Sequence, residues 1–387
     1  MSLWRLVHIG PFIALFVTFV CYCVAVIDSY LWLFPLHTSK FGIWNLIILT
    51  IWLALILRNF FFAVLLGPGF VPLEWTPDDK DDEKYLQYCF ICKGYKPPRA
   101  HHCRACKRCV MKMDHHCPWI NTCCGHQNHT NFVLFLFFAP VGCIHALIVC
   151  IFTLLYQLLW RAEMYQYAVA PVHFGVNAFF LNIIACGLAF GTIVAVGVLF
   201  AQQLKIIITN KTGIEQWIID KAEERTGQGA PPFTYPYDLG YKKNLSQIIN
   251  WNCRPEGSGY SWPVVEGCTN LTLSIEQLEQ KREKRKRTVL FLVKESYSGW
   301  WCPCTKGLCT CIRIPISDEP RIRLEVGDKI EVTRGSHYWL YGNKVLSETE
   351  SNEGKRVRGW FPRRCVLRLS PPRAMPNDTD ENTKKKD

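Results

Sequence analysis

Charged side chains are almost absent from four long stretches of this 387-residue sequence. The second stretch holds one arginine, Arg58, and the other three hold no Asp, Glu, Lys or Arg. Each has about 20 or more residues, which is the length that a helix needs to cross a hydrocarbon core about 30 Å thick. Buried helices of soluble proteins rarely lack charge for so long. We therefore predict four membrane spans, with expected ranges 6–27, 41–66, 131–159 and 172–204.

Acidic residues are missing between Lys84 and Met113, where eight Lys or Arg occur. This basic segment lies between expected spans two and three, whereas the loops 30–40 and 161–173 carry one Lys or Arg each. Because cytosolic loops of membrane proteins are enriched in Lys and Arg, we expect the basic segment and both termini in the cytosol. The formal net charge of +12 then favours anionic membrane lipid as a partner, and no nucleic acid is expected.

A cleavage region and a disulfide scaffold are also not expected. No short polar region of small residues follows the first apolar stretch, so we interpret that stretch as a retained anchor rather than a signal peptide. The chain has 20 cysteines, but most lie in a cluster with metal-ligand spacing or inside apolar stretches. This distribution favours reduced thiols in contact with the cytosol.

The basic segment contains a dense pattern of Cys and His. It reads Cys-x2-Cys, then His-Cys-x2-Cys-x2-Cys, then Asp-His-His-Cys, and then one more Cys. Zinc prefers four nitrogen or thiolate ligands, which short Cys-x2-Cys turns commonly supply. Two complete sets of four can be assembled within 35 residues, with residues to spare. Redox-active Cys-x-x-Cys pairs are the alternative, but they leave the histidines unexplained. The pattern therefore predicts two structural metal sites.

Three residues remain once eight ligands are set aside: Asp114, His115 and Cys117. A nucleophilic cysteine needs a base within hydrogen-bond reach and a group that orients the base, and these are the right three types. Basic neighbours favour the anionic form of a thiol, although a plain solvated basic face is an alternative for those charges. A non-catalytic zinc-stabilised membrane adaptor is the main rival interpretation, but an adaptor has no use for a spare thiol beside a base. A transporter would need paired charges within the membrane, which the sequence lacks.

The whole pattern from Cys89 to Phe132 resembles the cysteine-rich domain of the DHHC palmitoyltransferases, and it lies between spans two and three as in that family. The resemblance implies a protein S-acyltransferase that moves a long acyl group from acyl-CoA, through Cys117, to cysteines of cytosol-facing proteins. In this mechanism His115 is the base and Asp114 orients it. The implied cofactors are two Zn²⁺, one held by Cys89, Cys92, His102 and Cys109, and the other by Cys103, Cys106, His116 and Cys123.

The resemblance also implies an acyl cavity between the spans. Trp119, Phe132 and Phe135 are expected at its mouth, and Gly142 lies on span three where bulk would limit chain length. The small size of Gly142 predicts that a long chain is accepted. Three short motifs depart from the family pattern and bear on how Asp114 is held. This chain has Thr122 where the family has Asn, and Gly67-Pro68-Gly69 where the family has Asp-Pro-Gly. It also has Thr212-Gly213-Ile214-Glu215 where the family has Thr-Thr-x-Glu.

The segment after span four predicts several further features. Ile214, Trp217 and Ile218 share a helical face, which suits a short interfacial helix or ordinary packing equally. The stretch 235–240 with Asn244 resembles the family motif that packs against the catalytic loop. The basic run 281–287 suits contact with anionic lipid or a solvated linker.

A small all-β barrel is expected at the C-terminal end. The strand-like runs are 289–294, 321–324, 329–332, 338–341 and 360–366, and their motifs resemble an SH3 domain. Cys365 occupies the place of the usual groove tyrosine, which disfavours proline-rich peptides, although an accessory or regulatory protein remains a candidate partner. Two Cys-x-Cys pairs in this domain suit zinc or regulatory acylation, and we favour acylation slightly. They are Cys302, Cys304, Cys309 and Cys311.

The expected fold is an α-helical polytopic membrane protein with four transmembrane helices, a zinc-binding cysteine-rich cytosolic domain and a C-terminal SH3-like barrel. Lys384 and Lys385 match a dilysine signal that returns membrane proteins to the endoplasmic reticulum, and this signal with an SH3-like tail resembles an endoplasmic-reticulum member of the family. The expected segments are 1–66 (spans one and two), 67–130 (zinc domain), 131–208 (spans three and four), 209–287 (cytosolic linker with the interfacial helix and the C-terminal motif), 288–369 (SH3-like domain) and 370–387 (disordered tail).

Overall fold

The computed structural model describes residues 3–33, 40–160, 174–250, 254–317, 319–346 and 357–369. The chain forms two compact units, Met1–Ser274 and Ile275–Asp387. The division falls inside helix α8 (Thr272–Lys286). Lys384 and Lys385 lie outside the described residues.

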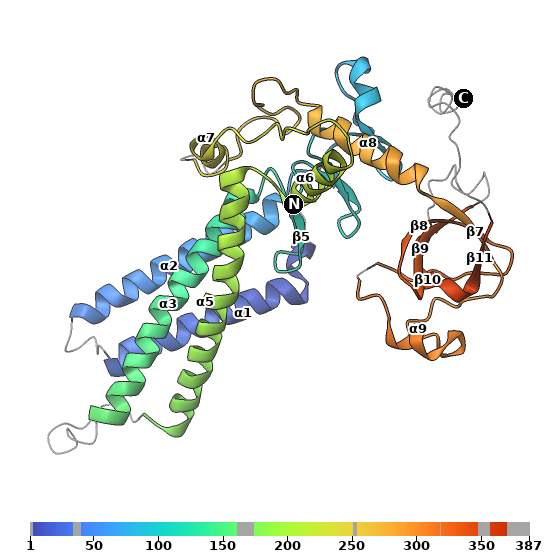
Figure 1. Ribbon diagram of the computed structural model, residues 1–387. Helices are drawn as coiled ribbons and strands as arrows, with labels where there is room; N and C mark the ends of the chain where they lie inside the picture. The colour runs from blue at the N-terminus through green and yellow to red at the C-terminus, as the bar shows by residue number, and fades with distance from the viewer. Residues whose placement is uncertain are drawn as a thin grey trace. The chain divides into compact units, whose positions relative to one another are not determined.

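Four long helices dominate the first unit (Figure 1). They are α1 (Ile9–Asp28), α2 (Lys40–Leu66), α3 (His129–Leu155) and α5 (Val176–Thr209). Short π-helical turns at Ser29–Leu33 and Tyr156–Trp160 continue α1 and α3. Within the described part of the chain, these four helices are long and apolar enough to cross a membrane. The predicted polytopic helical fold is therefore confirmed.

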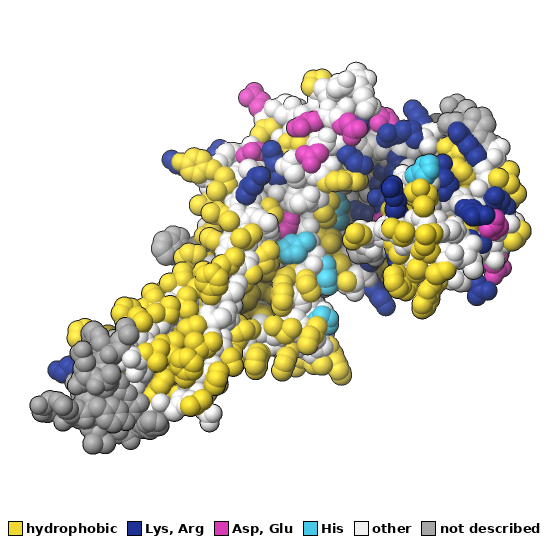
Figure 2. Space-filling model, turned by 60° about the horizontal axis from the view of Figure 1, so that its bottom comes forward, with side chains coloured by type: hydrophobic (Ala, Val, Ile, Leu, Met, Phe, Trp, Pro, Cys, Tyr) yellow, Lys and Arg dark blue, Asp and Glu magenta, His cyan; other side chains and the backbone are white. Residues whose placement is uncertain are grey.

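Helices α1 and α3 each contact all three other long helices, and α3 packs against them most extensively, so α3 is the centre of the bundle. Large apolar side chains such as Phe16, Ile51, Phe152 and Ile184 remain exposed on the outer faces. Figure 2 shows this surface as a continuous yellow area over the helical part, with few charged side chains. A soluble protein rarely exposes apolar patches of this extent, whereas lipid tails cover them without cost.

Helix α5 is longer than a membrane span requires. Its 34 residues correspond to about 51 Å at 1.5 Å per residue, compared with a hydrocarbon core of about 30 Å. The predicted span ended at residue 204, but the helix continues to Thr209. Its last turns therefore carry polar side chains such as Gln203 from the bundle to the cysteine-rich region.

The cysteine-rich region between α2 and α3 contains three short antiparallel hairpins. They pair β1 (Gln87–Cys89) with β2 (Gly94–Lys96), β3 (His101–Cys103) with β4 (Arg108–Val110), and β5 (His115–Cys117) with β6 (Thr122–Cys124). A residue with positive φ stands in each turn: Lys93, Lys107 and Asn121. Two-stranded hairpins of this size are marginally stable alone, so other interactions must hold them together.

The segment after α5 packs back on the first unit. Helix α6 (Gly213–Gly227) begins with a capping box, in which Thr212 and Glu215 bond each other's backbone amides. Ile218 is buried in a core cluster with Tyr237, whereas Trp217 is 59% exposed. The sequence suited this helical face equally to a membrane interface and to ordinary packing. For Ile218 the structure shows ordinary packing. Helix α7 (Tyr241–Ser246) lies against α5, and a 3₁₀ helix covers Lys80–Tyr85 before β1.

The second unit contains a five-stranded antiparallel sheet in the order β10-β9-β8-β7-β11, consistent with an SH3-like barrel. The strands are β7 (Val289–Val293), β8 (Lys329–Gly335), β9 (Trp339–Lys344), β10 (Arg358–Pro362) and β11 (Val366–Arg368). A 3₁₀ turn at Cys304–Lys306 and helix α9 (Leu308–Ile312) lie in the connection from β7 to β8. Trp339 and Phe361 are fully buried in its core.

Two strand predictions in this unit were wrong. The run 360–366 is two strands, because a 3₁₀ turn at Arg363–Cys365 follows Pro362, which has no amide proton for a ladder. The run 321–324 forms only isolated bridges, Arg321 to Trp360 and Leu324 to Tyr297.

Candidate active site and metal centres

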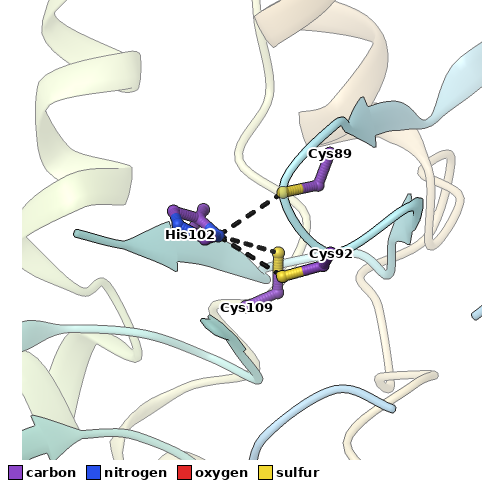
Figure 3. Close-up of side chains that lie close together, drawn as sticks. All are labelled: Cys89, Cys92, His102 and Cys109. Carbon is purple, nitrogen blue, oxygen red and sulfur yellow. Dashed lines mark hydrogen bonds between the residues drawn. The ribbon is translucent and has the colours of Figure 1, made fainter. Parts of the chain in front are cut away.

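The first Cys/His group joins the first two hairpins. Three thiol sulfurs surround one ring nitrogen: Nδ1 of His102 lies 3.4 Å from Sγ of Cys89, 3.5 Å from Sγ of Cys92 and 3.8 Å from Sγ of Cys109 (Figure 3). All four candidate ligand atoms lie within 4.8 Å of one another.

The second group joins the second and third hairpins. Nδ1 of His116 lies 3.6 Å from Sγ of Cys103, 3.4 Å from Sγ of Cys106 and 3.7 Å from Sγ of Cys123. These four atoms also lie within 4.8 Å of one another. The structure thus brings together both sets of four that the sequence suggested.

The spacing of these atoms fits zinc. In a tetrahedral site with Zn–S of about 2.3 Å and Zn–N of about 2.0–2.1 Å, a ligand sulfur and a ligand nitrogen are about 3.6 Å apart. The sulfur–nitrogen distances in the two groups run from 3.4 to 3.8 Å. The thiolate and imidazole donors are also the types that zinc prefers.

Strand alternation explains how one hairpin serves both groups. His102 and Cys109 are paired across β3 and β4, so they point to the same face. Cys103 follows His102 directly and therefore points to the opposite face, towards the second group. The middle hairpin thus links its two neighbours through the two groups.

The same alternation separates Cys117 from the second group. His116 and Cys123 are paired across β5 and β6 and both belong to that group. His115 and Cys117 flank His116 on β5, so both side chains point to the face that His116 does not use. The Cys117 side chain is 3% exposed and packs with Phe132 and Phe135.

Asp114 is held by three hydrogen bonds. Its Oδ2 lies 2.7 Å from Nδ1 of His115 and accepts a hydrogen bond of 2.9 Å from Nε2 of Gln203. Its Oδ1 accepts a hydrogen bond of 2.8 Å from the backbone amide of Gly213. Gly213 stands where the family has its second threonine, so a backbone donor at the start of α6 supports the carboxylate here. The positive end of the helix dipole adds to this support.

The charges of Asp114 and His115 stabilise each other. Burial alone would raise the pKa of Asp114, but the His115 hydrogen bond and charge, with the Gly213 and Gln203 bonds, hold it well below its usual value. Burial would lower the pKa of His115, but Asp114 and Cys117 raise it to about 10. His115 is therefore suited to carry a proton beside Cys117 at neutral pH.

A buried ion pair fixes α6 against the cysteine-rich region. Nε of Arg99 lies 2.6 Å from Oε1 of Glu215, and both side chains are fully buried. Tyr235 donates a hydrogen bond of 2.8 Å to Glu215, and the Arg99 guanidinium lies 4.4 Å from the ring centre of Tyr237. Because Glu215 belongs to the same first turn as Gly213, this pair also positions the amide that supports Asp114.

The motif 235–244 and the start of α1 also pack around the site. Nδ2 of Asn244 donates a hydrogen bond of 2.8 Å to the carbonyl of Ile208, near the end of α5. Gly10 approaches the carbonyl of Pro118 so closely that an added Cβ would lie 2.0 Å from its oxygen. Only glycine fits at this position. Because Gly10 has no Cβ, α1 can pack directly against the segment that follows Cys117.

An apolar cavity of about 340 Å³ lies among the four long helices. Its wall includes Trp119, Phe132, Phe135 and Gly142, the residues for which the family resemblance implied an acyl cavity. A Cβ added at Gly142 would lie 3.0 Å from Cδ1 of Ile56. The volume is within the usual range of small-ligand sites, about 300–1,000 Å³.

Two site residues, Gln203 and Lys112, were not found from the sequence, and a third, Thr122, was noted there only as a departure from the family pattern. Gln203 lies in the last part of an apolar span, and only its polarity there could have indicated a role. The hydroxyl of Thr122, paired with Cys117 across the hairpin, is buried without a hydrogen-bond partner among the described residues. Lys112 is buried over the ring of Trp262, and burial with the nearby Arg99 charge lowers its pKa to about 7.

The four cysteines in the connection from β7 to β8 are not equivalent. The sulfurs of Cys302, Cys304 and Cys311 lie within 4.8 Å of one another, whereas Cys309 is outside this group and exposed. Cys365 is fully buried in the barrel core, so its thiol does not face a peptide groove.

Comparisons with known proteins agree with this geometry. The model of the family described as DHHC palmitoyltransferase matches residues 82–220. Proteins named Palmitoyltransferase ZDHHC6 are 48% (Bos taurus) and 49% (Homo sapiens) identical over 380 residues, covering 94% of this chain and 92% of each relative. Probable protein S-acyltransferase 16 of Arabidopsis thaliana is 35% identical over 240 residues, covering 57% of this chain and 81% of the relative. The chain therefore belongs to the DHHC palmitoyltransferase family.

Proposed function

We propose that this chain is a membrane-embedded protein S-acyltransferase that transfers a long acyl group from acyl-CoA to cysteines of other proteins, with Cys117 as the acyl carrier. One arrangement supports this above all. His115 and Cys117 share a face of β5 that is turned away from the metal group, and Asp114 lies 2.7 Å from His115. A nucleophile, a base and an orienting carboxylate thus meet beside an apolar cavity.

The first step forms the acyl-enzyme. In the starting state the Cys117 proton lies on His115, and the Cys117 thiolate attacks the carbonyl carbon of the acyl-CoA thioester. The carbon–sulfur bond to CoA breaks, and the departing CoA thiolate takes the proton from His115. Asp114 holds the imidazole in place and stabilises its positive charge while the proton is there.

The second step transfers the acyl group to a client. The thiol of a client cysteine gives its proton to His115, and the resulting thiolate attacks the acyl-Cys117 carbonyl. Cys117 leaves as a thiolate paired with the protonated His115, which restores the starting state. One thioester replaces another, so the enzyme's main task is to position and activate the groups.

The cavity is the proposed site of the acyl chain. Its apolar wall, including Trp119, Phe132 and Phe135, begins beside Cys117 and continues between the helices. Burial of a chain of about sixteen carbons contributes up to about 12 kcal/mol gross, at about 0.8 kcal/mol per CH₂. Gly142 leaves space that a larger side chain would fill. We therefore expect Gly142→Leu to shift preference towards shorter acyl chains in a competition series of acyl-CoA lengths.

Two zinc ions are the proposed structural cofactors. Cys89, Cys92, His102 and Cys109 would hold one, and Cys103, Cys106, His116 and Cys123 the other. When bound, they supply rigidity: they would tie the three hairpins into one body and keep β5 in register beneath the cavity. Neither ion takes part in the transfer steps.

We place the enzyme in the endoplasmic reticulum membrane with both termini in the cytosol. The distribution of Lys and Arg supports this orientation, and Lys384 and Lys385 supply the dilysine signal. The basic cysteine-rich segment would attract the phosphates of CoA, and the clients would be proteins with cysteines facing the cytosol. The SH3-like domain remains the proposed contact for an accessory or regulatory protein.

Labelling with a radioactive or clickable palmitoyl-CoA tests the proposal. We expect a hydroxylamine-sensitive label on the purified wild-type protein, its loss in Cys117→Ser, and unchanged zinc content in that variant. Cys268→Ser, which removes a half-buried thiol outside both metal groups, should keep the label. Label that persists at the wild-type level in Cys117→Ser would refute the carrier role and favour a non-catalytic membrane adaptor.

A further inference from the structure

The connection from β7 to β8 brings three thiols together far along the chain from the DHHC motif. The sulfurs of Cys302, Cys304 and Cys311 lie within 4.8 Å of one another, and those of Cys302 and Cys304 are 3.8 Å apart. The family model ends at residue 220, so it assigns nothing to these cysteines. They form the third such group within the described residues.

The local backbone explains how the thiols meet. Cys304 begins a 3₁₀ turn that ends at Lys306, and Cys311 lies in the short helix α9. Gly307 between them has a φ of 106°, a conformation that residues with a Cβ rarely adopt. This reversal folds the start of α9 back so that Cys311 reaches the Cys302–Cys304 pair. The backbone amide of Cys311 bonds the Gly307 carbonyl at 3.3 Å.

Cys309 is excluded from the group by helix geometry. It lies two residues before Cys311 in α9, and two helical residues point about 200° apart. Cys309 is accordingly exposed and outside the group. The two Cys-x-Cys pairs look alike in the sequence, but the structure divides them into three gathered thiols, of which Cys304 is exposed, and one exposed thiol that stands apart, Cys309.

The connection that carries these thiols is bound to the barrel near both of its ends. The backbone amide of Lys294 bonds the Cys365 carbonyl at 2.9 Å, and the amide of Ile322 bonds the Trp360 carbonyl at 3.3 Å. Further contacts hold its middle part, which carries the thiols. Nε1 of Trp339 donates a hydrogen bond of 3.0 Å to the Thr310 carbonyl, and Nζ of Lys306 lies 3.0 Å from Oε2 of Glu295. A link between the Cys302–Cys304 pair and Cys311 would further stabilise the fold of the segment between them.

We propose that Cys302, Cys304 and Cys311 bind a zinc ion, with three thiolate ligands and a fourth position open to solvent. Two sulfurs of a tetrahedral zinc site are about 3.8 Å apart, which matches the Cys302–Cys304 distance of 3.8 Å. Thiolates are soft ligands that suit zinc. Lys306 and Arg364, which borders Gly307, supply positive charge for a site with three thiolates. This site is independent of the proposed acyl transfer.

Metal analysis of the full-length protein tests the proposal. The protein is purified in detergent with a reductant, and zinc per chain is measured by mass spectrometry. Cys302→Ser and Cys311→Ser should each contain one equivalent less than wild type, whereas the matched control Cys309→Ser should contain as much as wild type. An unchanged zinc content in Cys302→Ser and Cys311→Ser, or a loss in Cys309→Ser, would overturn the three-ligand site.

Thiol alkylation of the wild-type protein gives a second test that no substitution can disturb. With zinc bound, a maleimide should modify Cys309 readily and leave Cys302, Cys304 and Cys311 protected, and a strong chelator should remove the protection. Rapid modification of Cys304 and Cys311 before chelation would contradict the site. Protection that hydroxylamine removes and a chelator does not would show acylation of these cysteines instead of metal binding.

Discussion

The two faces of the β5–β6 hairpin carry neighbouring histidines in different surroundings. On one face His116 lies among three thiol sulfurs at 3.4–3.7 Å. On the other face His115 lies 2.7 Å from the Asp114 carboxylate and shares its side of the strand with Cys117. Residue type does not separate these roles, because both faces hold His and Cys. Strand alternation does, since consecutive side chains must point to opposite faces.

Replacing His116 by Ala should disrupt the hairpin face that carries the metal ligands, and we expect the largest effect from this change. One of four ligands is lost, and structural zinc contributes about 10–16 kcal/mol of apparent binding energy in small zinc domains. We expect zinc to fall by about one equivalent and the yield of monodisperse protein to fall with it. Metal analysis and size-exclusion chromatography measure both. A variant that keeps its zinc and its yield would show that His116 is not a ligand.

Replacing His115 by Ala should leave the metal face intact and stop the chemistry. Loss of a general base commonly slows a reaction by about 10²–10⁴-fold. We expect that reduction in the rate of acyl-Cys117 formation, followed in a labelling time course, with zinc content and yield as in wild type. His337→Ala in the second unit serves as the control. A loss of zinc in His115→Ala would mean that the two faces are not independent.

The local parts of this comparison could be predicted from the sequence. Charge-free stretches reveal the spans because lipid excludes charge, and the Cys and His spacing reveals the metal groups because zinc needs four close ligands. Both signals lie in short stretches of chain. His116 and Cys117 are neighbours on one strand, so their side chains must point to opposite faces of the hairpin.

The supports of Asp114 could not be predicted, because they depend on long-range packing. Gln203 reaches it only because the end of α5 packs beside the cysteine-rich region, 89 residues away along the chain from Asp114. The Gly213 amide reaches it only because Arg99 and Glu215, 116 residues apart, form a buried pair that fixes α6. The separation of Cys309 from Cys311 also required a helix that the sequence did not reveal.

Lys112 gives a pH-dependent test of the hairpin face that carries His115 and Cys117, because the charge of Lys112 lies near Asp114 and Glu215. Its pKa is about 7 in the fold and about 10.5 in the unfolded chain. Between those values the unfolded chain binds more protons, so stability rises with pH across this window. The buried lysine therefore destabilises the fold most below pH 7, by a few kcal/mol at most, since one pKa unit corresponds to about 1.4 kcal/mol.

Lys112→Met removes this charge and keeps the bulk. We expect the variant to have a higher melting temperature than wild type at pH 6, with a difference that shrinks steadily towards pH 10. Thermal unfolding of both proteins across that range measures the trend. An equal difference at every pH would mean that packing, and not the buried charge, distinguishes them.

Gly213→Thr is the mildest test, because it restores the threonine of the family motif beside Asp114. An added Cβ would meet only Oδ1 of Asp114, at 3.7 Å, which is ordinary contact. The carboxylate already accepts the Gly213 amide, so a further hydroxyl donor should change the acyl-transfer rate by less than about threefold. Removing a glycine should add about 0.4–1 kcal/mol of stability through the unfolded chain. A rate loss above tenfold, with zinc retained, would instead show that the close backbone approach to Asp114 is what this chain requires.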